Sequence, residues 1–370
     1  MVRIKAPKEY ISEPDVLYKA GEYIKKYGKK ALIVSSEKSL EATKDILLPS
    51  LKEADILYEI HLFTGYPTME AAETIAASYS DFDVVIGLGG GRVIDTAKVV
   101  GTKKDLPIVT IPTIAATCAS WAAVSILYNE KGEFTDAFFN KIGPVLILAD
   151  TRILFQAPKR YLYAGVIDTF AKWYEIYPYE KLQGDSTFLQ VMIDIAKRAH
   201  RTLTEKTPVA LLKAKAGEIG EEAVQTIDAI IFLAGLTGSL QTDTLYQGIG
   251  HPLYNVLSYV DETRHLLHGE KVGYGLLIQQ VLEQKTEEEI QEVIELFRSF
   301  ENAFTLENLH IKGNAEKLDF ISEKIWSDYH ESLNYLGYGF SANEISEAIL
   351  KIDDYIEHSK TKEPNRKKGE

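Results

Sequence analysis

The chain has 370 residues, which is long for one hydrophobic core and enough for two domains. Hydrophobic residues make up 45% of it and charged residues 26%, as in an ordinary globular protein, and a net charge of -13 argues against binding to nucleic acid or to an anionic membrane surface. The single cysteine, Cys118, excludes an intrachain disulfide and a cysteine-rich zinc site.

The N-terminal segment 1–14 is charged and has no apolar stretch of signal-peptide length. No apolar run elsewhere approaches the roughly 18 residues of a membrane span. We therefore expect a cytoplasmic protein without a membrane partner.

Short apolar runs alternate with amphipathic helical patterns in the first half of the chain. The runs predict five strands, at 31–34, 56–63, 83–88, 108–111 and 145–149, of which 56–63 is more amphipathic than the others. Helical patterns lie at 41–53 and 68–78. This alternation is typical of a Rossmann-like parallel sheet, which binds ligands at the carboxyl ends of its strands.

Helical patterns dominate after about Pro158. They predict helices at 164–177, 186–203, 220–235, 272–283, 287–300 and 341–358. The sequence therefore predicts an α/β protein with an N-terminal dinucleotide-binding domain at 1–157 and an all-helical C-terminal domain at 158–370.

A glycine-rich turn, Gly87-Leu88-Gly89-Gly90-Gly91-Arg92, lies between the third strand and a helical pattern that begins at Val93. Glycines let the backbone approach a pyrophosphate closely, and N–H groups at a helix start stabilise its negative charge. The spacing departs from the full Gly-x-Gly-x-x-Gly pattern because Arg92 takes the final position. This motif alone is compatible with a dinucleotide loop or with a simple tight turn.

Three of the eight histidines, His251, His265 and His268, fall within one short segment. Polar histidines on a helix surface would give the same pattern. Farther upstream, Asp168 lies between apolar neighbours, where a carboxylate is costly unless it is paired or bound to a metal. Two imidazoles, one carboxylate and an open position would form a catalytic metal site.

The segment from Thr110 to Trp121 follows the fourth predicted strand and is rich in small and hydroxyl side chains. It is either a loop that touches a nucleotide at the end of a strand, or a packing loop with Trp121 as its core anchor.

Together these segments resemble the glycerol dehydrogenase branch of the iron-containing (group III) alcohol dehydrogenases. The similarity runs in order from about Lys30 to Tyr355. The segments that carry it are Gly89–Lys98 (the family's dinucleotide loop), Pro112–Thr117, Gly165–Glu175 and His268–Val272. The resemblance implies the fold shared with dehydroquinate synthase, in which the helical domain binds metal and substrate.

The resemblance also implies a set of functional residues. It places the metal ligands, which are also the catalytic residues, on Asp168, His251 and His268, with zinc favoured over iron. His265 matches no ligand position. The implied contacts to NAD or NADP are Ser36, Gly89, Gly90, Gly91, Arg92, Val93, Asp95, Thr113, Ala116, Ala122, Val124 and Tyr128.

Several positions depart from the family's pattern. Ile167 replaces a glycine, Tyr254 a histidine, and Ala122 a hydroxyl residue. Cys118 stands where glycerol dehydrogenases have an aspartate that accepts hydrogen bonds from substrate hydroxyls; losing such a contact typically costs about 1–3 kcal/mol. The change also removes a charge that would repel a carboxylate.

The segments around Cys118 and Asp168 are most similar to the hydroxycarboxylate dehydrogenases. We therefore expect a metal-dependent oxidoreductase that interconverts 2-oxo acids and 2-hydroxy acids. The alternatives are a glycerol dehydrogenase, a lyase of the dehydroquinate synthase type and a nucleotide-binding protein that has lost its chemistry. The lyase normally has extra lysines and arginines, which we do not find near Asp168 or His251.

Two further expectations concern partners. Ser36 stands where NAD enzymes of the branch have an aspartate, so we expect NADP to be accepted at least as well as NAD unless Glu37 takes that role. We also expect a homo-oligomer whose partner in the reaction is a small alcohol or 2-oxo acid.

Overall fold

The structure is a computed structural model that describes residues 3–183, 186–241, 243, 246–335 and 340–361. The chain forms two compact units. The first comprises Met1–Thr169 and Asp194–Asp243, and the second comprises Phe170–Ile193 and Thr244–Glu370. Within the described residues, no helix is both long and apolar enough to cross a membrane.

The first unit is built on a six-stranded parallel sheet with the order β2-β9-β6-β5-β3-β4. Its strands are β2 (Glu9–Glu13), β3 (Lys30–Ser35), β4 (Leu57–Leu62), β5 (Val84–Gly89), β6 (Ile108–Pro112) and β9 (Leu146–Asp150). All five predicted strands are confirmed. The sequence did not predict β2, because Glu-Tyr-Ile-Ser-Glu is not an apolar run.

The strand order reverses at β3, which has β4 on one side and β5 on the other. In open parallel sheets, ligands bind outside the carboxyl ends of the strands at such a reversal. The chain leaves β3 at Ser36 and β5 at Gly90, so both predicted dinucleotide segments lie at this point of the sheet.

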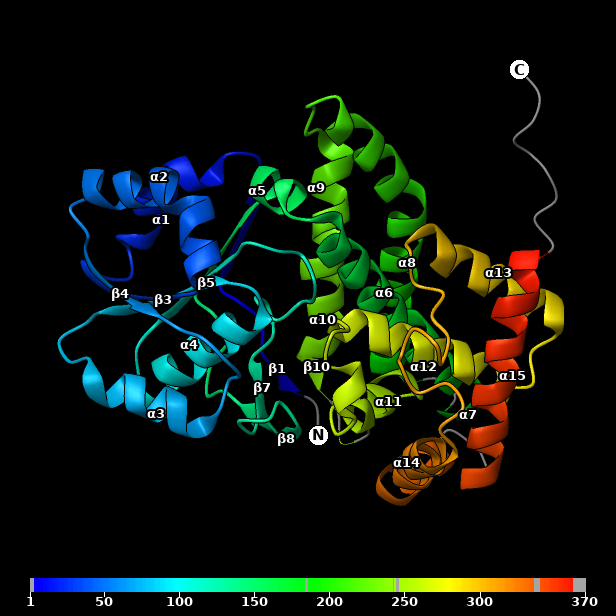
Figure 1. The fold of residues 1–370 in the computed structure, drawn as a ribbon. Helices are drawn as coiled ribbons and strands as arrows, with labels where there is room; N and C mark the ends of the chain where they lie inside the picture. The colour runs from blue at the N-terminus through cyan, green and yellow to red at the C-terminus, as the bar shows by residue number, and fades with distance from the viewer. Residues whose placement is uncertain (1–2, 184–185, 242, 244–245, 336–339, 362–370) are drawn as a thin grey trace. The chain divides into compact units, whose positions relative to one another are not determined.

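Helices cover both faces of the sheet (Figure 1). The 3-10 turn Val16–Lys19, α1 (Ala20–Ile24) and α2 (Glu37–Glu53) share one hydrophobic core with the sheet. On the opposite face, α3 (Met69–Ser78) and α4 (Gly91–Lys104) share a second core with it. The central strands β3, β5, β6 and β9 are buried on both sides, which is why they read as continuous apolar runs.

Two antiparallel pairs complete the described strands. β7 (Val124–Tyr128) and β8 (Phe134–Phe139) form a hairpin, and the short β1 (Arg3–Ile4) pairs with β10 (Leu240–Gln241). The segment expected to be all-helical, 158–370, therefore includes one short strand.

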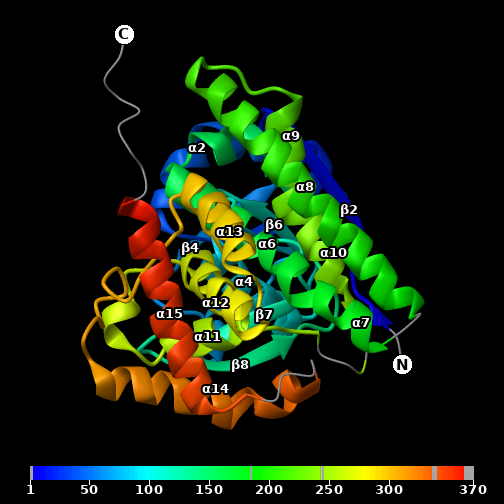
Figure 2. The ribbon, with the colours of Figure 1, turned by 90° about the vertical axis from the view of Figure 1, so that its right-hand side faces the viewer.

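The remaining α-helices follow β9, and several of them belong to the first unit. They are α5 (Thr151–Gln156), α6 (Lys159–Ile176), α7 (Glu180–Gln183), α8 (Thr187–Lys215), α9 (Glu221–Asp228), a π-helical turn (Ala229–Leu233), α10 (Ala234–Ser239), α11 (Gly250–Leu257), α12 (His268–Leu282), α13 (Glu287–Ser299), α14 (Ala315–Tyr335) and α15 (Ala342–Thr361). The sequence did not predict α11 or α14. In the second unit, α12 contacts α11, α13 and α15 (Figure 2).

The division into units differs from the boundary expected near residue 157. The first unit continues into α6 because Gly165 packs tightly on the segment after β6: a Cβ there would lie 1.9 Å from the carbonyl oxygen of Ala115. Residues 194–243, which include most of α8 as well as α9 and α10, also belong to the first unit.

Candidate functional site

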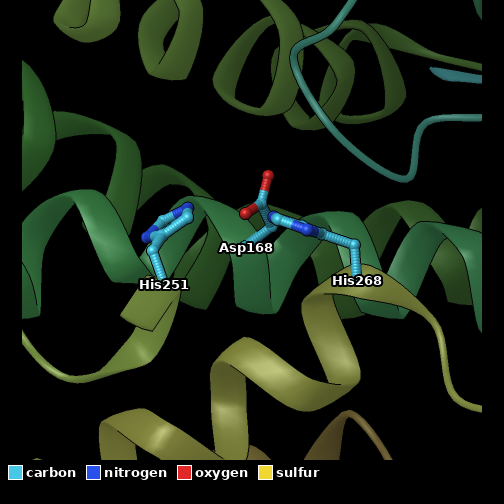
Figure 3. A group of neighbouring side chains, drawn as sticks. All are labelled: Asp168, His251 and His268. Carbon is cyan, nitrogen blue, oxygen red and sulfur yellow. The ribbon is translucent and has the colours of Figure 1, made fainter. Parts of the chain in front are cut away.

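Asp168, His251 and His268 form a group of potential metal ligands. One ligand atom from each residue lies within 4.8 Å of the others (Figure 3). Asp168 is buried in α6, His251 is the second residue of α11, and His268 is the first residue of α12. The structure thus brings together the three side chains that the family resemblance pointed to, although 83 and 17 residues separate them along the chain (251 − 168 and 268 − 251).

A buried carboxylate, Glu175, orients His251. Its Oε2 lies 2.5 Å from His251 Nδ1, while its Oε1 accepts hydrogen bonds from the backbone N–H groups of His251 (3.1 Å) and Gly248 (3.3 Å). Burial acts to raise the pKa of the Glu175 carboxyl, but the charge and hydrogen bonds of His251 lower that pKa by more, to below its ordinary value. With Nδ1 engaged, Nε2 is the His251 nitrogen left for a metal.

Nothing in the sequence predicts this role for Glu175. Its place at the end of the motif Gly165–Glu175 is the only signal that the sequence offers.

Glycines let α11 and α12 cross closely enough to bring the two histidines together. A Cβ on Gly275 would lie 2.8 Å from Gly250 Cα, and a Cβ on Gly250 would lie 3.1 Å from Glu175 Oε1. At the start of α12, Glu270 Oε2 accepts a hydrogen bond of 2.7 Å from the N–H of Leu267. This contact stabilises the first turn and so the position of His268.

Tyr254 contacts one of the proposed ligands, whereas His265 contacts backbone carbonyls instead. Tyr254 packs edge-on against His268, with ring centroids 4.1 Å apart. His265 lies outside the ligand group: its ring nitrogens are 2.8 Å from the carbonyl oxygen of Glu262 and 3.1 Å from that of Asn308.

The turn after β5 has the shape of an anion cradle. A Cβ on Gly90 would lie 2.7 Å from Ile114 Cδ1, and one on Gly91 would lie 3.6 Å from Thr117 Oγ1. Gly90 precedes α4 and offers no capping side chain to the N–H groups of the first turn. Those groups are suited to a pyrophosphate. Val93, also expected at this turn, is buried and contributes to the core.

Asp95 points into the protein, where it forms a buried ion pair with Lys98 at 2.8 Å. The Lys98 ammonium also donates to the backbone carbonyls of Ala119 (2.9 Å), Ala122 (3.0 Å) and Val124 (2.5 Å). Three positions expected to contact the dinucleotide, Asp95, Ala122 and Val124, thus take part in an internal contact that holds the segment between β6 and β7.

Ser36 and Thr113 are linked through Ser39. The Ser36 hydroxyl caps α2 by accepting from the N–H of Ser39 (3.2 Å), and Thr113 Oγ1 donates to Ser39 Oγ (3.1 Å). The ends of β3 and β6 therefore carry hydroxyl groups that lie close together.

The remaining residues expected to contact cofactor or substrate are Arg92, Tyr128, Ala116 and Cys118. Arg92 is exposed, and its guanidinium lies over the Tyr66 ring at 4.1 Å from the centroid. Tyr66 is in turn 5.8 Å from Tyr128, centroid to centroid. Ala116 and Cys118 are partly exposed.

Trp121 anchors the segment that carries Cys118. Its ring is buried, its Nε1 donates to Ser239 Oγ (3.0 Å), and a Cβ on Gly235 would lie only 2.3 Å from its Cγ. The packing interpretation of Trp121 is therefore correct, and it is compatible with a binding role for the small residues that precede it.

Comparisons with known proteins agree on one family. Residues 7–151 match the model of the iron-containing alcohol dehydrogenases. Hydroxycarboxylate dehydrogenase A of Escherichia coli is 30% identical over 339 residues, which cover 89% of this chain and 88% of that protein. A glycerol dehydrogenase of Pseudomonas putida is 28% identical over 373 residues, covering 96% and 98%. The crystal structure of glycerol dehydrogenase from Schizosaccharomyces pombe has a TM-score of 0.87 at 24% identity, covers 98% of this chain and 93% of that one, and has the same fold.

Proposed function

Because the chain belongs to the iron-containing alcohol dehydrogenase family, in its glycerol dehydrogenase branch, we propose that it is a metal-dependent, NAD(P)-linked dehydrogenase that interconverts 2-oxo acids and 2-hydroxy acids. The observation that supports metal-dependent chemistry is that ligand atoms of Asp168, His251 and His268 lie within 4.8 Å of one another. The choice of substrate class depends on Cys118.

The donor set fits a catalytic divalent metal. One carboxylate and two imidazoles leave a fourth position open, and we propose zinc, with iron as the alternative. Asp168, His251 and His268 would hold the metal, which would lower the pKa of a substrate hydroxyl in oxidation and polarise a ketone in reduction. Asp168 supplies a buried negative charge, and Glu175 keeps the His251 ring in one orientation and tautomer.

The glycine turn fits the dinucleotide. Gly89, Gly90 and Gly91 would hold the pyrophosphate against the N-terminus of α4, with the exposed Arg92 adding positive charge. Tyr128 would contact the nicotinamide ring, the part of the cofactor that would supply or accept hydride. Thr113 would lie at the adenosine ribose end instead, because its hydroxyl is bonded to Ser39 beside Ser36.

Cys118 favours a carboxylate substrate over a polyol. Its thiol is partly exposed and is neutral when protonated, so it neither repels a carboxylate nor accepts hydrogen bonds from hydroxyls as an aspartate does. Overall identity fits either substrate class, 30% to hydroxycarboxylate dehydrogenase A and 28% to the Pseudomonas putida glycerol dehydrogenase, so the choice rests on Cys118.

The test is a substrate panel run with the metal-loaded protein and both cofactors. We expect kcat/KM for the best 2-oxo acid to exceed kcat/KM for glycerol. Cys118→Asp is expected to reduce oxo-acid use about tenfold or more, a cost of about 1.4 kcal/mol, whereas the neutral Cys118→Ser control retains it. A higher kcat/KM for glycerol would contradict this proposal and support glycerol oxidation to dihydroxyacetone, the activity that the Pseudomonas putida relative's name implies.

A further inference from the structure

The strand β4 is an exposed edge of the sheet with an apolar surface. It pairs with β3, and within the described part of the chain no strand pairs with its other side (Figure 1). Leu57, Tyr58 and Leu62 are 69%, 37% and 51% exposed. Edge strands are usually protected by charged residues, proline or a bulge; β4 has no proline, lysine or bulge, and Glu59 is its one acidic residue.

The opposite edge of the same sheet is covered. Tyr10 of β2 donates a hydrogen bond of 2.8 Å to Asp228 in α9, and its ring packs against Trp121 and Phe232. The exposure of β4 is therefore a property of this one edge.

The backbone of β4 shows which groups face the open side. The N–H groups of Leu57 and Phe63 donate to the carbonyls of Lys29 and Ser35, at 2.8 and 2.7 Å, so odd-numbered residues point towards β3. In a strand, the N–H and C=O of one residue point to the same side, and the side alternates along the chain. The groups of Tyr58, Ile60 and Leu62 therefore point to the open edge.

We propose that β4 pairs with β4 of a second copy of this chain, antiparallel, about a two-fold axis at Ile60. In this register, Ile60 faces its own copy and Tyr58 faces Leu62 of the second copy. These are the residues whose backbone groups point outward, so each such pair can exchange both of its N–H···O=C bonds. The exposed side chains of Tyr58 and Leu62 then contact each other across the pair, on one face of the sheet.

Charge selects this register over its neighbours. With the axis at Ile60, Glu59 faces His61 of the second copy, a carboxylate opposite an imidazole that can donate to it. An axis at Glu59 would set two glutamates opposite each other, which is destabilising. An axis at His61 would set two imidazoles together and separate Tyr58 from Leu62. The segment Tyr58–Leu62 is thus self-complementary in one register.

The first test measures the mass of the full chain by sedimentation velocity. Tyr58→Lys/Leu62→Lys places introduced lysines opposite each other, and we expect it to halve the mass of the wild-type assembly. Leu212→Lys on α8 is the matched control, because Leu212 is 70% exposed and lies outside β4; its mass should not change. A monomeric wild type, or a double variant of unchanged mass, would overturn the proposal.

A charge exchange tests the register itself. His61→Glu places two carboxylates across the pair, and Glu59→Lys removes the acceptor and sets an ammonium against the imidazole, so each variant is expected to dissociate. The combined variant restores opposite charges and should recover the wild-type mass, whereas in the Glu59-centred register it would set two lysines together. Circular dichroism melts show whether the variants are folded, which matters for His61 because its Nδ1 lies 3.3 Å from the Tyr79 hydroxyl. Folded single variants that keep the full mass, or a folded combined variant that stays dissociated, would contradict the Ile60 axis.

Discussion

At the scale of single residues, the candidate metal centre depends on Glu175 as well as on its ligands. The carboxylate contacts His251 through both the ring and the backbone, so it positions the start of α11 and one imidazole at once. Its net negative charge survives burial because His251 lowers its pKa. Such partners of metal ligands contribute strongly to metal affinity.

We predict that Glu175→Gln lowers metal affinity by about 10–100-fold while the chain stays folded, because an amide keeps the shape but loses the charge. Titration of metal-free protein in the presence of a competing chelator measures the change. Glu180→Gln, at an exposed position shortly after α6, is the control and should bind as the wild type does. Equal affinity of the two variants would show that Glu175 is not needed to orient His251.

Ser36 is the residue that bears most directly on cofactor choice. Its hydroxyl caps α2, and the neighbouring Glu37 and Lys38 are exposed at the start of the same helix. A neutral cap at this position neither accepts both ribose hydrogen bonds as a carboxylate does nor repels the additional phosphate of NADP. We therefore retain the prediction that NADP is used at least as well as NAD.

Ser36→Asp is expected to shift the preference towards NAD by about tenfold or more, equivalent to about 1.4 kcal/mol. Aspartate and asparagine both cap helices well, so Ser36→Asn is a control that keeps the cap without the charge. The ratio of kcat/KM with the two cofactors is the measurement. If the wild type already prefers NAD by that margin, Glu37 has taken the role, and Glu37→Ala should remove the preference.

At the scale of elements, α4 both begins the cradle and holds the segment that follows β6. Lys98 and Asp95 lie one turn apart with side chains 1% and 9% exposed, and the ammonium reaches three carbonyls between Ala119 and Val124. A buried lysine with four oxygen partners replaces the hydrogen bonds that this segment would otherwise make to water. The segment includes the turn just after Cys118, whose carbonyl accepts from the N–H of Trp121 (2.9 Å).

We predict that Lys98→Met destabilises the protein by about 3–5 kcal/mol, since it removes the cation that neutralises the buried Asp95 carboxylate. Asp95→Asn/Lys98→Met removes that charge and should recover part of the loss. Because Cys118 is the only cysteine, its rate of reaction with a thiol reagent reports on the segment and should rise in both variants. Lys103→Met, at a far more exposed lysine of α4, is the control. An unchanged thiol reactivity in the folded double variant would show that Lys98 does not hold this segment.

At the scale of the whole molecule, the three proposed ligands come from α6, α11 and α12, which are far apart in the sequence. A metal that binds only the folded chain stabilises it by mass action, by about 2.7 kcal/mol at a free concentration 100 times the Kd. We therefore expect removal of the metal to lower both the free energy of unfolding and the enzymatic activity.

A chelator is expected to lower the Tm of the wild type, and added zinc to restore it. His268→Ala should abolish activity and remove this metal-dependent shift, because one ligand is lost. His265→Ala should keep both, since its ring nitrogens contact backbone carbonyls. Full activity of a metal-free preparation would contradict the proposed mechanism.

The sequence alone determined the features that depend on short stretches of chain. The central strands are apolar runs because both faces of a parallel sheet are buried, and the turn Gly89–Gly91 is visible as three consecutive glycines between a strand and a helix. The positions of the ligands came from the resemblance of several motifs in order, since Asp168, His251 and His268 show no local pattern that requires a metal.

The tertiary structure decided what depends on residues that are distant in the sequence. The polar strand β2 forms only by pairing with β9, Glu175 acts on a histidine 76 positions later, and Asp95 turns to Lys98 and the segment after β6 instead of outward. Residues 194–243 return to the first unit because helix packing, not sequence order, determines which side chains share a core. The periodicity of apolar residues indicates which face of a helix or strand is buried. Which other helix or strand packs against that face is decided only when the chain folds.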